Sequence, residues 1–159
     1  MAVPAEWTAP DPEVGPAPGV EWASPGARLV GYIVDLLVQF GLTIALLLVG
    51  TVLLAVFAPL GLIAYLAGGL FLFLYFPYFW QKTGQTPGMR IMNIKVVSDK
   101  DGGPIGWGPA ILRLIGYWIS GIVFYIGYIW IFIDKRKRGW FDLLAGTVVV
   151  KTGSDLTSA

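Results

Sequence analysis

The chain has 159 residues, of which 56% are hydrophobic and only 13% are charged. Because a typical soluble domain carries about 25% charged residues, this chain lacks the polar side chains that would cover a soluble globule of its size. Its mean hydropathy of +0.71 also favours lipid as the solvent. With no cysteine and no histidine, it lacks thiolate ligands and the commonest general base. We therefore expect no enzymatic activity, no cofactor and no metal site, and the net charge of +1 gives no basis for binding nucleic acid.

The N-terminal residues 1–26 have a composition unlike that of the remaining chain. They hold six of the eleven prolines and four carboxylates but no Lys or Arg, and they lack the basic and apolar regions of a cleavable signal peptide. Such a segment cannot bury enough apolar surface to offset its ordering entropy, so we predict a disordered tail. A docking peptide around Trp7 and Trp22 is the alternative. We expect a membrane domain over residues 27–151 and a flexible tail over residues 152–159.

Two long apolar segments follow, over residues 29–57 and 62–80. About 20 residues suffice to cross the hydrocarbon core of a bilayer, so each segment predicts a transmembrane helix. Pro59 and Gly61 indicate a tight connection between them. The sequence therefore predicts an all-α integral membrane protein whose first partner is the lipid bilayer.

The link over residues 81–108 is polar and rich in turn formers. It carries four Lys or Arg residues, whereas the link over residues 58–61 carries none. Since these residues prefer cytoplasmic flanks, we predict a multi-pass protein with a cytoplasmic N-terminus. Residues 90–97 and 146–151 are both β-prone, and one interpretation is that they pair as short strands at the cytoplasmic surface.

The third apolar segment, residues 111–133, permits two topologies. As one straight helix its 23 residues would measure about 35 Å, enough for a single crossing. A single crossing would place the basic run at residues 135–138 outside the cell, against the charge rule. A re-entrant pair of short helices that breaks near residues 120–121 would return the chain to the cytoplasmic face, where the basic run can contact anionic lipid headgroups.

Arg28 and Asp35 lie seven residues apart, about 700° of helical rotation, and so share one face of the first segment. A carboxylate in an apolar segment opposes insertion by about 2.5–3.5 kcal/mol at the helix centre, so Asp35 must point toward a partner or water. In one interpretation it pairs with Arg113 and fixes the helix register. In a second it belongs to an ion or proton route, and in a third to a subunit contact.

Asp142 has comparable alternatives. It either caps a short interfacial helix or meets the basic run at residues 135–138, or it reaches Arg28 or Arg113. If the C-terminus is cytoplasmic, five ionised residues can gather at one membrane face to form an ion-binding charge cluster, and we predict that cluster. Its members are Arg28, Asp35, Arg113, Asp134 and Asp142.

The chain resembles the RDD family, bacterial membrane proteins named for one arginine and two aspartates. Arg28, Asp35 and Asp142 match these three residues, and the resemblance covers about residues 24–151. A middle signature matches GQTPGMR, with Gly84, Thr86 and Gly88, and a later one matches WFDLLAGTVVV, with Gly146 and Thr147. The chain departs from the family in its KRKRGWFD stretch, where members often have a less basic run and a histidine.

The resemblance implies a bacterial inner-membrane location and a suspected transport role. We therefore expect transport of ions or small solutes through the buried Arg/Asp cluster, by a homo-oligomer or a larger membrane complex. The alternative is a non-catalytic accessory or assembly subunit of such a complex.

Overall fold

The computed structural model describes residues 15–16, 19–123 and 125–152 of the chain. Eight helices and strands lie in these ranges. In chain order they are α1 (Pro25–Val56), α2 (Ala58–Thr83), α3 (Pro87–Ile91), β1 (Ile94–Ser98), α4 (Trp107–Ile122), α5 (Ile126–Ile133), α6 (Trp140–Ala145) and β2 (Thr147–Lys151).

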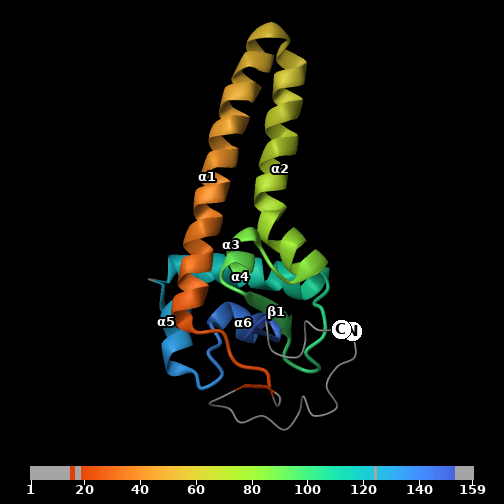
Figure 1. Ribbon diagram of the computed structural model, residues 1–159. Coiled ribbons are helices and arrows are strands. Elements are labelled where there is room, and N and C mark those ends of the chain that lie inside the picture. The colour runs from red at the N-terminus through yellow and green to blue at the C-terminus, as the bar shows by residue number, and fades with distance from the viewer. Residues whose placement is uncertain (1–14, 17–18, 124, 153–159) are drawn as a thin grey trace.

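Helices α1 and α2 form a long hairpin that projects from the rest of the molecule (Figure 1). The Ser24 side chain caps α1 by accepting a hydrogen bond from the Ala27 amide at 3.2 Å, and Phe57 alone separates α1 from α2. Both helices are long and apolar enough to cross a membrane, and few of their residues are buried within the protein. Large side chains such as Leu66 point outward and are 75% exposed. The two predicted spans are confirmed, and lipid is the natural solvent for this surface.

The third apolar segment is a pair of helices, α4 and α5, rather than one straight helix. Their axes differ by 104°, and α4 runs across the base of the hairpin instead of along it (Figure 1). Helix α4 buries Arg113 and Leu114 on one face and exposes Trp118 and Ile122 on another. The break falls after residue 122, slightly later than predicted. Within the described ranges, two helices are thus long and apolar enough to span a membrane, or three if the bent pair counts as one span.

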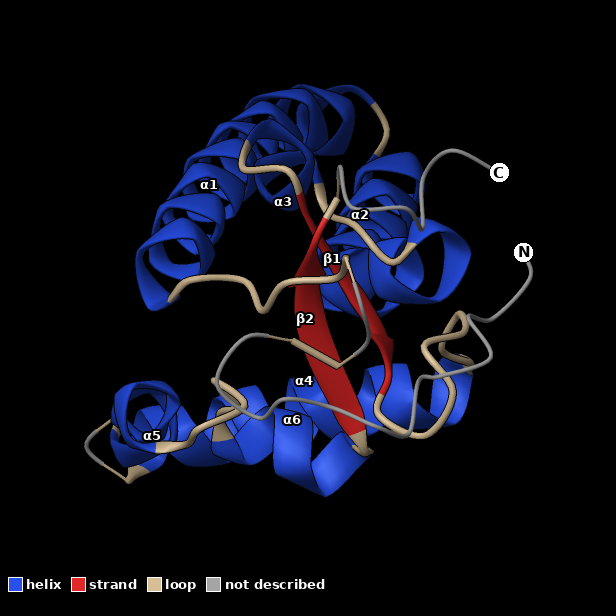
Figure 2. Ribbon diagram, turned by 60° about the horizontal axis from the view of Figure 1, so that its bottom comes forward, coloured by secondary structure: helices blue, strands red, loops and turns tan. Residues whose placement is uncertain are grey.

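The predicted pairing of the two β-prone stretches is confirmed. Strands β1 and β2 form an antiparallel ladder in which Val96 lies opposite Val149. One face of this sheet packs with Trp80 and Met89, and the other packs with Val20 and Trp22. Figure 2 shows the strands between the α1–α3 region and the layer of α4 and α6. Burial on both faces explains why β2 is a continuous valine run rather than an alternating one.

The predicted boundary of the N-terminal tail at residue 26 is wrong. The Ala23 amide donates a hydrogen bond to the Val149 carbonyl at 2.9 Å, and the Lys151 amide donates to the Glu21 carbonyl at 2.9 Å. Trp22 forms a bridge with Val150 and is only 6% exposed. Residues 21–23 therefore pair with the free edge of β2, and this valine-rich strand also offers Trp22 an apolar face. The rest of the predicted tail, with Trp7, and the predicted tail after residue 152 lie outside the described residues.

Candidate functional site

A buried ion cluster joins three elements that are far apart in the chain. Asp142 on α6 contacts two guanidinium groups, those of Arg28 on α1 and Arg113 on α4. The Arg28 Nη1 to Asp142 Oδ2 distance is 2.6 Å. The side chains of Arg28, Arg113 and Asp142 are 8%, 1% and 0% exposed. This contact places the start of α1 and the chain after α5 at the same end of the hairpin. The predicted cluster could form only with that arrangement.

Local structure holds Asp142 in position. Asp142 lies in the first turn of α6, where its Oδ2 accepts a hydrogen bond from the Gly139 amide at 3.0 Å. Helix α6 ends at Gly146, which adopts the left-handed conformation with φ 63°, and Thr147 follows at once. The Thr147 hydroxyl contacts Arg113 Nη1 at 2.6 Å and Asp142 Oδ1 at 3.4 Å. The predicted motif residues Gly146 and Thr147 thus turn the chain into β2 and complete the cluster.

The two arginines keep Asp142 ionised. Burial by itself opposes ionisation, but the charges of Arg113 and Arg28 outweigh it and hold the pKa of Asp142 below its usual value. Aromatic rings also face Arg113, with its Cζ 4.7 Å from the ring centre of Trp80 and 5.5 Å from that of Phe141. Two guanidinium groups and one carboxylate leave this cluster with a net charge of about +1 at neutral pH.

Asp35 belongs to a second, separate centre. Its side chain is buried and accepts hydrogen bonds from the Tyr75 hydroxyl at 3.1 Å, the Gly88 amide at 2.9 Å and the Thr86 hydroxyl. Neither Arg28 nor Arg113 forms an ion pair with it in the described chain. The interpretation that pairs Asp35 with Arg113 is therefore wrong. Asp142 forms the ion pairs with both arginines, and Asp35 accepts hydrogen bonds from neutral donors instead.

The middle signature supplies most of the Asp35 centre. Thr86 caps α3 by accepting a hydrogen bond from the Met89 amide at 3.2 Å, and its hydroxyl donates to Asp35. Gly84 ends α2 in the left-handed conformation with φ 72°, and its carbonyl accepts from the Val96 amide at 2.8 Å. The signature therefore turns the chain back from α2 so that α3 meets α1 at Asp35.

Asp134 is not a member of either centre, which corrects the predicted five-residue cluster. Its carboxylate accepts hydrogen bonds from the backbone amide and the Nε of Arg138, at 3.1 and 3.0 Å. Within the basic run, Arg136 and Arg138 also each contact Asp99 at 3.3 Å. Burial by itself raises the pKa of Asp134, but the bonds and charge of Arg138 leave it below the usual value. Asp134 therefore organises the loop after α5.

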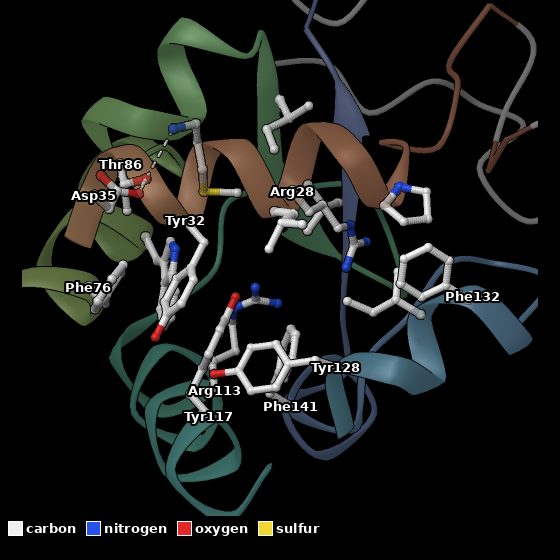
Figure 3. Close-up of a pocket in the computed structure, with 17 residues that line it drawn as sticks. Arg28, Tyr32, Asp35, Phe76, Thr86, Arg113, Tyr117, Tyr128, Phe132 and Phe141 are labelled. Atoms are coloured by element: carbon white, nitrogen blue, oxygen red, sulfur yellow. Dashed lines mark hydrogen bonds between the residues drawn. The ribbon is translucent and has the colours of Figure 1, made fainter. Parts of the chain in front are cut away.

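One cavity of about 100 Å³ borders both centres, because Asp35, Arg28 and Arg113 all line it. Figure 3 shows the two guanidinium groups pointing into the space that separates α1 from α4, with the Asp35–Thr86 pair farther along α1. Most of the lining is aromatic or aliphatic, including Phe76 and Ile131. Among the described residues, no group of three carboxylates is placed to hold a metal ion.

Sequence reasoning missed residues of the Asp35 centre and of this cavity. Tyr75 lies in the second apolar segment and carried no functional prediction, yet its hydroxyl donates to Asp35. Tyr117 and Tyr128 line the cavity beside Tyr32, and Tyr117 stacks on Phe141 with ring centres 4.0 Å apart. Tyr32 lies four residues after Arg28 and three before Asp35, so helical spacing puts it on the face that those two residues share. That spacing is the one sequence signal for a tyrosine at this site. The others come from α2, α4 and α5, whose packing no local pattern fixes.

Comparisons with known proteins give a family match and several partial relatives. The family model of the RDD family matches residues 22–146. The chain is 30% identical over 67 residues to the Proline-rich antigen homolog of Mycobacterium tuberculosis (strain H37Rv), covering 42% of this chain and 28% of that protein. It is 40% identical over 65 residues to the Uncharacterized protein YxaI of Bacillus subtilis (strain 168), covering 41% of this chain and 42% of that protein.

The chain thus spans less than half the length of either relative. No solved structure matches it. The family match extends over the hairpin, both charged centres and the start of the turn into β2. This chain belongs to the RDD family.

Proposed function

We propose that this RDD-family protein is a non-catalytic transport protein that moves an ion or a small solute across the membrane. In this proposal Asp35 is the carboxylate that takes up and releases the ion. The observation that carries it is the environment of Asp35: a carboxylate buried in a spanning helix, bordering a cavity, and surrounded by neutral hydrogen-bond donors. Ionisable groups within membrane-spanning helices are expensive and usually mark ion or proton pathways.

The contrast with Asp142 supports this assignment. Two guanidinium groups compensate the charge of Asp142, so a mobile cation has little to gain there. The three neutral donors of Asp35 orient its oxygens but leave its charge uncompensated within the described chain. A proton or a small monovalent cation that reached Asp35 through the cavity would neutralise that charge, and its departure would restore it.

An oligomer is part of the proposal. Two long helices do not by themselves enclose a path across a bilayer, and both expose apolar side chains along their length. We propose that several copies, or this chain within a larger membrane complex, surround the path in the bacterial inner membrane. The N-terminus, and with it the layer of α4, α6 and the sheet, would face the cytoplasm, since the basic residues cluster there.

Flux through proteoliposomes tests the proposal. The full chain is reconstituted with a pH-sensitive dye or a monovalent-cation tracer inside the vesicles, and a gradient is applied. Asp35→Asn should abolish flux, because the amide keeps the size of the carboxyl group but cannot carry its charge. The matched control is Asp101→Asn, since Asp101 lies on an exposed loop and the substitution removes the same charge.

Equal flux through the parent and Asp35→Asn would refute the assignment of Asp35. The accessory-subunit alternative has a different signature. It requires that the parent shows no flux alone and co-purifies in a fixed ratio with an unrelated membrane protein after extraction with a gentle detergent.

A further inference from the structure

We propose that Arg28 and Arg113 form a binding site for a phosphate group, and that the cavity beside them admits either the headgroup of an anionic phospholipid or a soluble phosphate ester. This inference goes beyond transport, since it concerns binding alone and holds whether or not a solute crosses the membrane. The supporting observation is that some guanidinium N–H groups of Arg28 and Arg113 form no hydrogen bond within the ion cluster.

Asp142 does not use all the donors of the two arginines. Arg28 binds Asp142 through Nη1, whereas its Nε and Nη2 are buried and have no hydrogen-bond partner among the described residues. The Nε of Arg113 is buried and unpartnered in the same sense. Unpartnered buried donors are rare and costly, and the cost is greater for charged groups. Both side chains line the cavity, so a ligand in the cavity is within reach of them.

The charge of the cluster selects an anion. Two guanidinium groups against one carboxylate leave about one positive charge that the described cluster does not compensate. A phosphodiester carries one negative charge and would complete the balance. Guanidinium groups match the oxygens of phosphate in two-point contacts, so the geometry of the leftover donors favours an oxyanion over a spherical ion.

The surroundings favour a phosphate that carries an apolar group. The cavity is lined near Arg28 by Leu29 and Phe132, and these two side chains are also 57% and 68% exposed on the surface of the protein. Arg28 lies in the first turn of α1, which is long and apolar enough to cross a membrane. In a bilayer that α1 crosses, phospholipid headgroups would lie near this end of the helix. Basic pockets between helices at this level bind anionic headgroups. Acyl chains could follow Leu29 and Phe132 while the phosphate meets the arginines.

Native mass spectrometry of the full chain in a neutral maltoside detergent tests the proposal. Short-chain phosphatidylglycerol, short-chain phosphatidylcholine and glycerol 3-phosphate are titrated separately, in buffer free of phosphate and sulfate. We expect the parent to bind phosphatidylglycerol more tightly than phosphatidylcholine, whose choline cation offsets its phosphate. Binding of glycerol 3-phosphate with similar strength would identify a soluble ester as a ligand, whereas binding of phosphatidylglycerol alone would identify the lipid.

The variants separate phosphate recognition from apolar burial. Arg28→Gln should weaken phosphatidylglycerol binding by about tenfold or more, because charge-assisted donors are lost. Arg28→Lys keeps the positive charge near Asp142 but removes the two unpartnered donors, and should weaken binding as well, which keeps the test valid if the glutamine variant does not fold. Arg136→Gln is the control, since Arg136 pairs with Asp99 outside the cavity. The proposal is refuted if the parent binds no phosphate compound, if the two lipids bind equally, or if Arg28→Lys binds like the parent.

Discussion

Gly31 and Gly88 bring the backbones of α1 and α3 into direct contact beside Asp35. A Cβ atom on Gly88 would lie 2.0 Å from the Gly31 carbonyl oxygen and 2.9 Å from the Asp35 carboxylate. This close approach is what allows the Gly88 amide to donate a hydrogen bond to Asp35 at 2.9 Å. Gly88 of the middle signature is therefore needed because only glycine lets the two helix backbones approach this closely. A substitution there would disturb both the contact of α1 with α3 and the geometry around Asp35.

Gly88→Ala should destabilise the protein, because the added methyl group meets backbone atoms that cannot rotate away. Overpacking of this kind typically costs about 1–3 kcal/mol. The measurement is thermal unfolding in detergent, in which the fraction of protein that stays monodisperse is recorded at each temperature. The control is Gly69→Ala on α2, where a Cβ would meet no atom within 4 Å. Equal melting temperatures for the two variants would contradict the close contact between α1 and α3.

Asp142→Asn should be among the most destabilising substitutions of a single charged residue in this chain. It removes the one carboxylate that compensates Arg28 and Arg113 in the described cluster, and breaking a buried ion pair in this way costs about 3–5 kcal/mol. Unfolding in detergent measures the loss. Asp134→Asn provides the comparison, since its side chain is 16% exposed and its partner Arg138 retains Asp99. The explanation fails if both variants melt at the same temperature.

The sequence was sufficient for the hairpin and for part of the charge cluster. Long apolar runs leave few alternatives to transmembrane helices. The demand for counter-charges made Arg28 and Arg113 partners for an aspartate, and Asp142 is that aspartate. Composition and spacing could not decide which aspartate pairs with the two arginines. Asp35 and Asp142 carry the same side chain, and only the fold places neutral donors around one of them.

The predicted tail boundary was wrong, and the sequence could not choose between a single crossing and a bent pair for the third segment. Both have a different cause. Proline and acidic residues before residue 19 resemble a disordered tail, but Trp22 is ordered by an apolar sheet face that forms only when β1 and β2 pair. Likewise, no proline marks the position of the break after residue 122 in the sequence. Tyr125 adopts a left-handed conformation there, with φ 59°, and tertiary packing overrides the helical pattern of the surrounding residues.

The contribution of Asp134 to stability should depend on pH with a predictable sign. Because its pKa is lowered in the folded protein, its bonds to Arg138 stabilise the fold fully above the unfolded pKa of about 3.9. That stabilisation is lost as the pH falls through the lower folded pKa. The difference in unfolding free energy between the parent and Asp134→Asn should therefore stay constant from about pH 7 to pH 5 and shrink below about pH 4. A difference that persists unchanged in acid would contradict the lowered pKa.

Cysteine labelling should place Glu21 and Lys151 on one side of the membrane and Ala58 on the other. The natural chain has no cysteine, so single variants Glu21→Cys, Lys151→Cys and Ala58→Cys have no background. The Lys151 amide donates to the Glu21 carbonyl at 2.9 Å, which requires a common side, whereas Ala58 begins the second helix at the far end of the hairpin. The measurement is reaction with a membrane-impermeant maleimide in vesicles of known orientation.

We expect positions 21 and 151 to react from the cytoplasmic side, because the basic run at residues 135–138 lies between Asp142 and the end of α5 and prefers that side. Reaction of all three positions from the opposite sides would reverse the proposed orientation but leave the ion cluster intact. Reaction of position 151 from the same side as position 58 would contradict the ion cluster itself. It would separate β2 and Asp142 from the start of α1 by a bilayer, and the contact between Arg28 and Asp142 could not exist.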